Sequence, residues 1–308
     1  MTLEQLRIFV AVAEHQHVTR AAKELNLTQS ATSAAIAALE ARYAMKFFDR
    51  VGRRIELTET GRLFLVEARA VLAQAAAAEA VLDDLAGLKR GTLSIAASQT
   101  VANYWLPPRM HRFREAYPGI SLRLKIGNTE QVTAWVNELA VDLGFVEGAI
   151  DNPALSAKPV AEDSLVLVAY AEHPWAAKRK VTREHLIATD WVLREPGSGT
   201  RSITEAALAR LGVPISECKI ALELPSNEAV LSAVENGAGA TIVSEVAARA
   251  AIEAGTLLRR DIDLPKRQFY VLLHKERSAN AAQRAFLDLI EGASRPQSKI
   301  KKRFAAAP

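Results

Sequence analysis

The sequence predicts an α/β protein with a separate helical segment at its N-terminus. Three patterns carry this prediction: two short amphipathic stretches joined by a tight turn within residues 18–43, an unbroken helical pattern over residues 62–88, and alternating strands and helices from residue 92 onward. Strands that alternate with helices are typical of a mostly parallel sheet covered by helices. At 308 residues, the chain is long enough for two or three domains.

Composition excludes several classes of protein. Hydrophobic residues make up 49% of the chain and charged residues 24%, as in ordinary globular proteins. Cys218 is the single cysteine, so we expect neither a disulfide framework nor a cysteine-based zinc site. The sequence has no signal-peptide pattern and no uncharged apolar run of the roughly 18 residues that a membrane span needs. We therefore expect a cytoplasmic protein without a membrane partner.

The pattern of residues 18–43 predicts a helix-turn-helix. The first helix has one apolar stripe between Val18 and Leu25, and Thr28 offers a hydroxyl N-cap to a second helix that ends near Tyr43. Such a helix can enter the major groove of DNA, where a glutamine pairs with adenine through two hydrogen bonds. The first turn of the second helix presents small polar side chains, namely Thr28, Gln29, Ser30, Thr32 and Ser33.

A basic hairpin follows this second helix. Between residues 42 and 54 the basic residues face a single acid, Asp49, while Gly52 allows a turn and Ile55 and Leu57 alternate as a short strand. A basic loop beside a helix-turn-helix can hold DNA phosphates and fix the position of the reading helix, although an ordinary solvated helix pair is the alternative. We predict that bases are read by Thr28, Gln29, Ser30 and Ser33, and that the basic contacts come from Arg20, Arg50, Arg53 and Arg54.

Residues 3–61 resemble the DNA-binding domain of LysR-type transcriptional regulators. One departure is Ala34-Ala35, where members of that family usually carry a basic residue and often glutamine, so the departure bears on operator preference. The residues that carry the resemblance are Leu3, Leu6, Phe9, Ala21, Ala22, Leu25, Gln29, Ser33, Ile36, Leu39, Glu40, Phe48, Arg50, Arg53, Leu57, Thr58 and Gly61.

The resemblance implies the organisation of the whole chain. We expect a winged helix-turn-helix at residues 1–60, a linker helix at 61–89 that dimerises the protein, and an effector-binding domain at 90–294. This last domain would have the two-lobed, periplasmic-binding-protein-like fold, with lobe I at 90–162 and 264–294 and lobe II at 163–263. Residues 295–308 read as a basic, disordered tail.

The helical pattern of residues 62–88 predicts helix pairing. Its apolar residues recur at steps of four and three over about three heptads, which is typical of a seam between two helices. We expect a homodimer or homotetramer, since two copies suit two DNA half-sites, and an amphipathic helix packed on its own domain is the alternative. The seam positions are Phe64, Ala68, Val71, Ala75, Ala78, Leu82 and Leu85.

Strands and helices alternate through the remainder of the chain. The resemblance implies that the strands form two sheets, joined by crossovers near residues 161–163 and 263–265. The predicted strands are 92–97, 120–126, 142–146, 164–170, 190–194, 219–224, 240–243 and 269–274. The predicted helices are 101–117, 129–139, 200–211, 227–236, 244–254 and 279–292.

Three polar segments, at residues 98–100, 128–129 and 194–201, each follow a predicted strand and precede a helix. In open α/β sheets, ligands bind beyond the carboxyl ends of strands, where helix N-termini offer free N–H groups. Arg201 would oppose the helix dipole from the first turn unless an anion compensates it. The alternative is a helix cap whose glycines serve geometry alone, and neither a dinucleotide fingerprint nor a P-loop is present.

The resemblance implies that these segments line a ligand cleft between the two lobes. The loop at 194–201, with residues 226–228, is most similar to a branch that senses sulfur oxyanions or other small anions. We expect anion sensing, with sulfite as the specific candidate and a carboxylate or phosphorylated metabolite as the alternative. Glu147 would oppose a dianion unless it is protonated or paired, and Arg201 is its candidate partner; a cap or a salt bridge at the surface is the alternative role of Glu147. The expected site residues are Ser98, Gln99, Thr100, Thr129, Glu147, Glu195, Gly197, Ser198, Thr200, Arg201 and Asn227.

An enzyme and a solute-binding protein are the alternative functions. The sequence shows no nucleophile–base arrangement, His15 and His17 lack a third metal ligand nearby, and Cys218 has no resolving cysteine. The N-terminal 90 residues do not suit an uptake protein. We therefore expect no catalytic activity, no metal and no cofactor. The expected partners are double-stranded DNA, a small anion and a second copy of the chain, with RNA polymerase as a further candidate.

Overall fold

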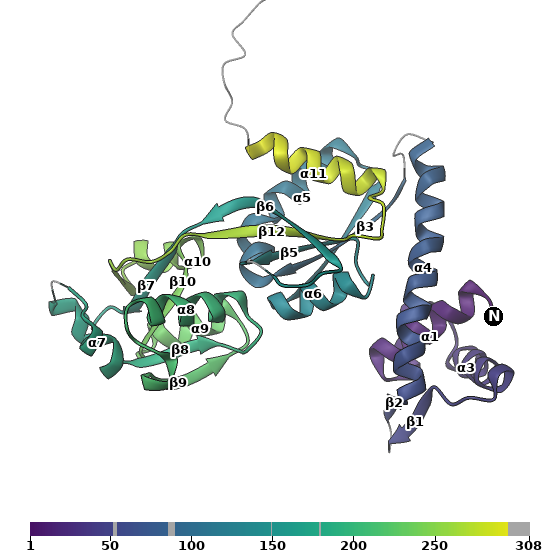
Figure 1. Cartoon of the computed structure of the whole chain (residues 1–308), viewed down its shortest axis with the longest axis horizontal. Helices are drawn as coiled ribbons and strands as arrows, with labels where there is room; N and C mark the ends of the chain where they lie inside the picture. Colours follow the sequence, from purple (N-terminus) through teal and green to yellow (C-terminus); the bar gives the residue numbers. More distant parts are fainter. Residues whose placement is uncertain (52–53, 86–89, 149, 179, 295–308) are drawn as a thin grey trace, which may run out of the picture. The chain divides into compact units, whose positions relative to one another are not determined.

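The computed structural model describes residues 1–51, 54–85, 90–148, 150–178 and 180–294, and it forms two compact units (Figure 1). The N-terminal unit contains the first four helices and a two-stranded hairpin. The C-terminal unit contains two five-stranded sheets with helices packed on them. No helix in these ranges is long and apolar enough to cross a membrane. The tail at residues 295–308 lies outside the described residues.

The helix-turn-helix prediction is confirmed in the N-terminal unit. Helix α2 (Val18–Glu24) is joined by a short turn to α3 (Gln29–Tyr43), and the Thr28 hydroxyl accepts a hydrogen bond from the Ala31 N–H at 3.2 Å. Strands β1 (Phe48–Val51) and β2 (Arg54–Leu57) pair antiparallel as the wing. Helix α1 (Leu3–His15), which the sequence pattern did not predict, begins with a capping box formed by Thr2 and Gln5.

Aromatic rings form the centre of the N-terminal unit. The ring of Phe9 lies 5.4 Å from that of Phe47 and 4.8 Å from that of Phe64, which is on α4 (Glu59–Leu85). Ala68, one turn further along α4, is buried in the same cluster. The prediction that these positions belong to a seam between chains is therefore wrong for Ala68, which is buried, whereas Phe64 is half-buried. They pack on their own unit because α1 and the start of the wing lie against that face of α4.

The first sheet of the C-terminal unit, lobe I, has the strand order β4-β3-β5-β12-β6. β3 runs parallel to β4 and β5, whereas β12 runs antiparallel to β5 and β6. Its strands are β3 (Gly91–Ser98), β4 (Ile120–Gly127), β5 (Leu143–Glu147), β6 (Leu155–Asp163) and β12 (Arg267–His274). Its helical elements are η1 (Val101–Trp105), α5 (Pro107–Ala116), α6 (Thr129–Asn137) and α11 (Ala281–Ser294).

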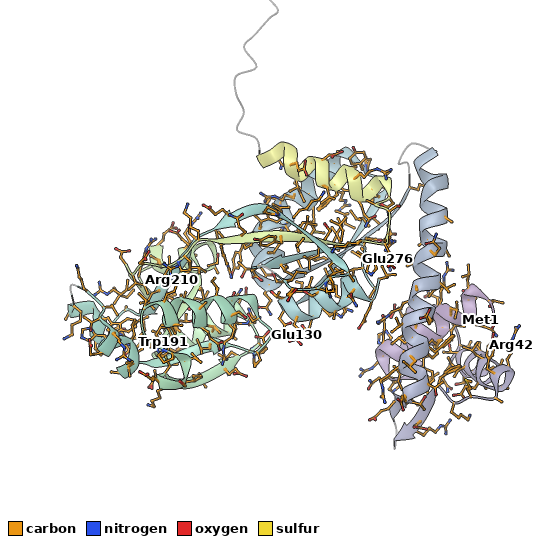
Figure 2. All side chains as sticks on the ribbon, viewed as in Figure 1. Met1, Arg42, Glu130, Trp191, Arg210 and Glu276 are labelled. Atoms are coloured by element: carbon orange, nitrogen blue, oxygen red, sulfur yellow. The ribbon has the colours of Figure 1, made fainter. Side chains whose placement is uncertain are left out.

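The second sheet, lobe II, has the order β11-β7-β10-β8-β9, in which β8 runs parallel to β9 and β10 and β7 runs antiparallel to β10 and β11. Its strands are β7 (Leu165–Tyr170), β8 (Asp190–Arg194), β9 (Lys219–Leu224), β10 (Ala240–Ser244) and β11 (Leu257–Arg260). Its helical elements are η2 (Pro174–Ala177), α7 (Arg183–Ala188), α8 (Gly199–Arg210), η3 (Ile215–Glu217), α9 (Asn227–Glu235) and α10 (Glu245–Glu253). Trp191 and Arg210 mark this lobe in Figure 2.

Each sheet combines a parallel half with an antiparallel half, which corrects the prediction of mostly parallel sheets. The antiparallel members include the strands through which the chain passes between the lobes, β6 into β7 on the way out and β11 into β12 on the return. The sequence did not predict β6 and β11. β6 is an edge strand with mixed burial that contains Pro159, and such strands lack a clear apolar pattern.

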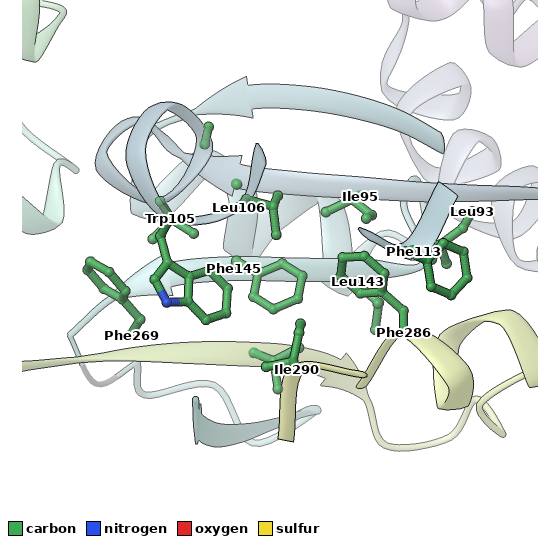
Figure 3. Close-up of a cluster of buried hydrophobic side chains, with 14 of the residues drawn as sticks. Leu93, Ile95, Trp105, Leu106, Phe113, Leu143, Phe145, Phe269, Phe286 and Ile290 are labelled. Atoms are coloured by element: carbon green, nitrogen blue, oxygen red, sulfur yellow. The ribbon is translucent and has the colours of Figure 1, made fainter. Parts of the chain in front are cut away.

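The core of lobe I combines aromatic side chains with leucine and isoleucine (Figure 3). The ring of Phe145 lies 5.8 Å from that of Trp105 and 6.2 Å from that of Phe286. The helix predicted at residues 101–117 is divided into η1 and α5 in this region. A new helix begins at Pro107 because proline has no N–H to donate and suits the first helical position.

Candidate functional site

The first turn of α3 presents a polar surface. Thr28, Gln29 and Ser30 are exposed, and Ser33, one turn later, is half-buried. The Gln29 side-chain amide donates to the Ser33 hydroxyl at 3.3 Å, which aligns two predicted base-reading groups on one face of the helix. Thr32 does not belong to this surface. It is fully buried, and its hydroxyl donates to the Thr28 carbonyl at 3.0 Å.

The basic residues predicted to contact phosphates lie on two elements. Arg20 is exposed on α2, and Arg50 is exposed on β1. The predicted turn at Gly52, together with Arg53, lies outside the described residues, and so does the side chain of Arg54, whose backbone pairs with Val51 in the wing.

Glu40 joins the end of α3 to the wing. Its carboxylate accepts hydrogen bonds from the N–H groups of Phe47 at 2.8 Å and Phe48 at 3.3 Å and from the Lys46 ammonium at 2.7 Å. Burial alone would raise the pKa of Glu40, but the hydrogen bonds from Lys46 and the two N–H groups lower this pKa below its ordinary value. The ionised carboxylate therefore holds the reading helix and the wing together.

An apolar surface is exposed beside these elements. Leu63 is 69% exposed and Val66 is 55% exposed, both on α4. Large side chains from other parts of the unit line the same surface hollow, so the apolar area is continuous. We call this surface the α4 patch; it consists of Met1, Tyr43, Met45, Phe47, Leu63, Phe64 and Val66.

The strand ends of lobe I meet helix N-termini of lobe II in the C-terminal unit. The Asn227 side-chain amide, on α9, donates to the Thr100 hydroxyl at 3.0 Å, and the Asn227 N–H donates to the Gln99 side-chain oxygen at 3.0 Å. Gly199, at the start of α8, lies so close to lobe I that a Cβ there would be 2.7 Å from the Thr129 hydroxyl oxygen. We call this meeting place the cleft.

The cleft contains unused hydrogen-bonding groups. The Ser98 hydroxyl is 1% exposed and has no hydrogen-bond partner among the described residues. The N–H groups of Gly199 and Thr200 form no hydrogen bond with those residues either, because they open helix α8 and the Ser198 cap accepts from Arg201. Free amides and a buried hydroxyl are groups that can hold an anion.

A glycine is required in the loop before α8. Gly197 has a φ of +82°, in the left-handed region, and a Cβ there would lie 2.4 Å from the Glu130 carboxylate. The Glu130 N–H donates to the Gly197 carbonyl at 3.2 Å, so the loop lies directly against the start of α6. Gly197 thus has a clear geometric role, as in the alternative of a simple helix cap.

Arg194 is a buried cation of the cleft that is neutralised within lobe II. Its guanidinium donates to the Glu195 carboxylate at 2.8 and 3.0 Å and to the Asn227 side-chain oxygen at 2.8 Å. Burial would raise the pKa of Glu195, but Arg194 and the Asn128 amide lower this pKa below its ordinary value. Glu195 therefore belongs to an internal ion pair.

Arg267 is a cleft residue that sequence reasoning missed. It is 3% exposed, and its guanidinium donates to the Asp163 carboxylate at 2.7 Å, to the Thr200 hydroxyl at 3.2 Å and to the Thr100 hydroxyl at 3.4 Å. Asp163 also accepts from the Ser244 hydroxyl at 2.7 Å. Arg267 thus contacts both lobes from the start of the returning strand β12. No local pattern identifies it, because all its partners are distant in sequence.

Arg201 has different partners from those predicted. It pairs with the Glu205 carboxylate one turn along α8 and with Glu223 on β9 at 2.8 Å. Burial would lower the pKa of Arg201, but these two carboxylates raise it above its ordinary value. The predicted pairing with Glu147 is wrong, because two acids of lobe II already compensate the cation at this helix N-terminus. Glu147 accepts instead from the Thr129 hydroxyl at 3.3 Å.

The weaker candidates show no site chemistry. His15 contacts the Glu24 carboxylate, and no cluster of three or more metal-ligating residues occurs among the described residues. Burial and the neighbouring Glu217 raise the pKa of the Cys218 thiol, so the reactive thiolate is disfavoured there.

Comparison with known proteins gives matches over nearly the whole chain. A family profile described as the LysR substrate binding domain matches residues 86–295. A second, described as bacterial regulatory helix-turn-helix protein, lysR family, matches residues 3–62. A relative from Escherichia coli K12, the uncharacterized HTH-type transcriptional regulator YeiE, is 36% identical over 299 residues, which cover 96% of this chain and 99% of that relative.

Solved structures share the fold. Full-length CbnR complexed with its target DNA aligns with a TM-score of 0.67 at 23% identity, covering 96% of this chain and 100% of that one. The CcmR regulatory domain of Synechocystis, in complex with 2-PG, aligns with a TM-score of 0.61 at 28% identity. That alignment covers 68% of this chain and 99% of the domain.

Proposed function

The chain belongs to the LysR family of transcriptional regulators, and we propose that a small anion bound in the cleft controls its action on DNA. Family membership makes the protein a DNA-binding regulator with an effector-binding domain, and not an enzyme. The proposal concerns the effector, the residues that bind it, the residues that read DNA, and the assembly.

One observation supports the anion most directly: segments that meet in the cleft carry donors without protein partners among the described residues. The N–H groups of Gly199 and Thr200 and the buried hydroxyl of Ser98 lack protein partners among the described residues. Helix α8 has 12 residues, so its N-terminus carries the positive end of a substantial dipole. An oxyanion would satisfy these donors. The proposed site also includes Gln99, Thr100, Thr129, Glu147, Glu195, Gly197, Ser198, Arg201 and Asn227.

The chemical class of the effector has two candidates. A sulfur oxyanion such as sulfite is the first, and a carboxylate or phosphorylated metabolite is the second. The CcmR domain, which is 28% identical and was solved with 2-PG, supports the second candidate. Both classes present oxygen atoms to the same donors, so their relative affinities must be measured.

For DNA we propose that Gln29, Ser30 and Ser33, with Thr28, read base edges in the major groove. Arg20, Arg50, Arg53 and Arg54 would contact phosphates. The exposure of Thr28, Gln29 and Ser30 on one turn of α3 supports this assignment. Because DNA is the partner, we propose a cytoplasmic location.

We further propose that a second copy of the chain covers the α4 patch. Leu63 and Val66 are large apolar side chains exposed on a helix, which a stable assembly would bury. The result would be a homodimer or, through further contacts, a homotetramer, with RNA polymerase as a further candidate partner. We also propose that the DNA-binding domain ends at residue 60, the linker helix at residue 89 and the effector-binding domain at residue 294.

The anion would act by favouring one arrangement of the lobes. Regulation requires that the anion bind that arrangement more tightly, because a ligand with equal affinity for two arrangements does not change their populations. In the structure the lobes are joined by the bonds of Asn227 to Thr100 and of Arg267 to Thr200. A ligand that competes for these hydroxyls would change how the lobes meet.

The test is a thermal-shift screen of sulfite, sulfate, thiosulfate, phosphate and carboxylates, followed by DNA mobility-shift assays. A ligand at about 100 times its Kd stabilises the native state by about 2.7 kcal/mol, so a true effector raises the Tm clearly. We expect Thr100→Ala to reduce that rise and to leave DNA binding intact. The absence of a shift with every anion tested would refute the proposal.

A further inference from the structure

Glu147 is a buried carboxylate in the cleft without a cationic partner among the described residues. It is 4% exposed, and the hydrogen bond that it accepts there comes from the neutral hydroxyl of Thr129, at 3.3 Å. The buried cations of the cleft pair with other acids, Arg194 with Glu195 and Arg267 with Asp163. Each of these pairs is neutral, so neither cation is left to pair with the Glu147 carboxylate.

The Cβ of Glu147 lies beside the N-terminus of α8, which we propose to hold the anion. A Cβ on Gly199 would lie 2.7 Å from the Glu147 carbonyl oxygen and 3.2 Å from the Glu147 Cβ. An anion on the free N–H groups of Gly199 and Thr200 would therefore be a near neighbour of Glu147. Two negative oxygens at such a distance repel each other, because burial weakens the screening by water.

The repulsion becomes attraction when the ligand carries a hydrogen atom. An ionised carboxylate only accepts hydrogen bonds, so it needs an O–H group on its partner. Hydrogen bonds between a hydroxyl and a carboxylate are short and strong. A protonated oxyanion can offer its O–H to Glu147 and its remaining oxygens to the donors of Ser98 and α8.

We propose that Glu147 is a specificity-determining residue that selects anions carrying their own O–H group and rejects fully deprotonated ones. The inference rests on the proposed anion site and defines its ligand class. Inorganic phosphate, hydrogen sulfite and hydroxy acids carry such a group near neutral pH, and phosphate monoesters carry one below their second pKa of about 6, whereas sulfate and simple carboxylates do not. Under this proposal, a ligand is accepted because it carries an O–H group, whether its oxygens are bonded to sulfur, phosphorus or carbon.

Isothermal titration of the full-length protein tests this selection. At a pH below the second pKa of methyl phosphate, about 6, the probes with an O–H group are phosphate, methyl phosphate, sulfite and glycolate, and the matched probes without one are sulfate and acetate. We expect the tightest O–H ligand to bind at least about tenfold more tightly than sulfate, as a charged hydrogen bond allows. In Glu147→Gln the side-chain amide can donate to a bare oxygen, so we expect the preference over sulfate to disappear. Glu253→Gln, which removes an exposed charge on α10, should keep the preference.

The pH dependence of the unmodified protein provides a second measurement that needs no variant. The last proton of a phosphate monoester is lost near pH 6, at a second pKa of about 6. We expect the affinity for methyl phosphate to fall as pH rises through this value, whereas the affinity for sulfate should stay constant. DNA binding and the Tm without ligand will show whether Glu147→Gln is folded.

The outcomes distinguish a failure of the proposed role of Glu147 from a failure of the proposed anion site. Sulfate binding as tight as that of the best O–H ligand would overturn the role of Glu147 and keep the anion site. The same follows if the affinity for methyl phosphate does not change with pH. Failure of all six probes to bind would overturn the anion site itself and the role of Glu147 with it.

Discussion

The reading surface on α3 and the cleft use the same chemical groups, hydroxyls and side-chain amides, in opposite surroundings. Thr28, Gln29 and Ser30 are exposed and come from one turn of one helix, so water satisfies them when DNA is absent. Ser98 and Asn227 are buried and come from separate segments that only the fold brings together. A buried polar group without a partner costs about 1–3 kcal/mol, whereas an exposed one does not. Substitutions of hydrogen-bonded residues in the cleft should therefore lower stability, and those on the reading surface should change only binding.

The largest expected effect is that of Arg267→Met. The substitution leaves Asp163 buried without its cation, which should lower the free energy of unfolding by about 3–5 kcal/mol. Urea unfolding followed by tryptophan fluorescence measures this, because all 4 tryptophans, at residues 105, 135, 175 and 191, lie in the C-terminal unit.

Arg259→Met is the matched control for this experiment. Arg259 pairs with Glu245 at 2.7 Å, but both side chains are well exposed, so the loss should be at most about 1 kcal/mol. Equal losses for the two variants would contradict the distinction between the buried cleft and the surface.

Glu40→Gln tests the buried charge that Glu40 places in the N-terminal unit. The lowered pKa of Glu40 means that its stabilisation is present above the ordinary glutamate pKa and is lost as the pH falls through the folded value. We expect the free energy of unfolding to fall by roughly 1.5–3 kcal/mol at neutral pH. In the acid range, we expect this free energy to depend less on pH than it does in the unmodified protein. Hydrogen exchange at the N–H groups of Phe47 and Phe48 measures it. The exposed Glu56→Gln should show neither effect.

Gln29→Ala should act on binding alone. Loss of a bidentate contact to a base costs about 1–3 kcal/mol of discrimination, and the Tm should stay unchanged because the side chain is exposed. Mobility-shift assays on an operator and on its single-base variants measure the discrimination. Gln74→Ala, an exposed glutamine on α4, is the control of matched type. An unchanged preference at every operator position would remove Gln29 from the reading surface.

The sequence predicted the reading surface more completely than the cleft, because a helix repeats locally. The N-cap at Thr28 and the end of α3 near Tyr43 follow from neighbouring residues, and the structure confirms both. Thr32 was misassigned because its residue type is polar. Its position three residues before Ala35 and seven before Leu39 places it on the inward stripe, and helical periodicity contained that information.

In the cleft, only the segments were predictable. A strand followed by a polar turn and a helix identifies residues 98–100 and 194–201 as sites at a sheet end, since this pattern is local. The partners of Arg267 and Arg201 were not predictable. Arg267 bonds to Asp163 and Thr100, and Arg201 bonds to Glu223 on a neighbouring strand, so both sets of partners depend on how the strands are ordered. Strand order is a tertiary property that no local spacing encodes.

The smallest expected effect on stability, and the sharpest test of the comparison, is that of Ser98→Ala. The Ser98 hydroxyl has no partner among the described residues, so its removal should leave the free energy of unfolding unchanged or raise it by about 1 kcal/mol. Ser244→Ala is the matched control, because the equally buried Ser244 hydroxyl donates to Asp163 at 2.7 Å, and its loss should cost about 1.5–3 kcal/mol. If Ser98 is kept for a ligand, Ser98→Ala should at the same time weaken anion binding by about tenfold, measured by titration calorimetry. If Ser98→Ala loses stability but keeps its affinity for the anion, Ser98 stabilises the fold and does not bind the ligand. The contrast between the exposed reading surface and the cleft would then not hold at this residue.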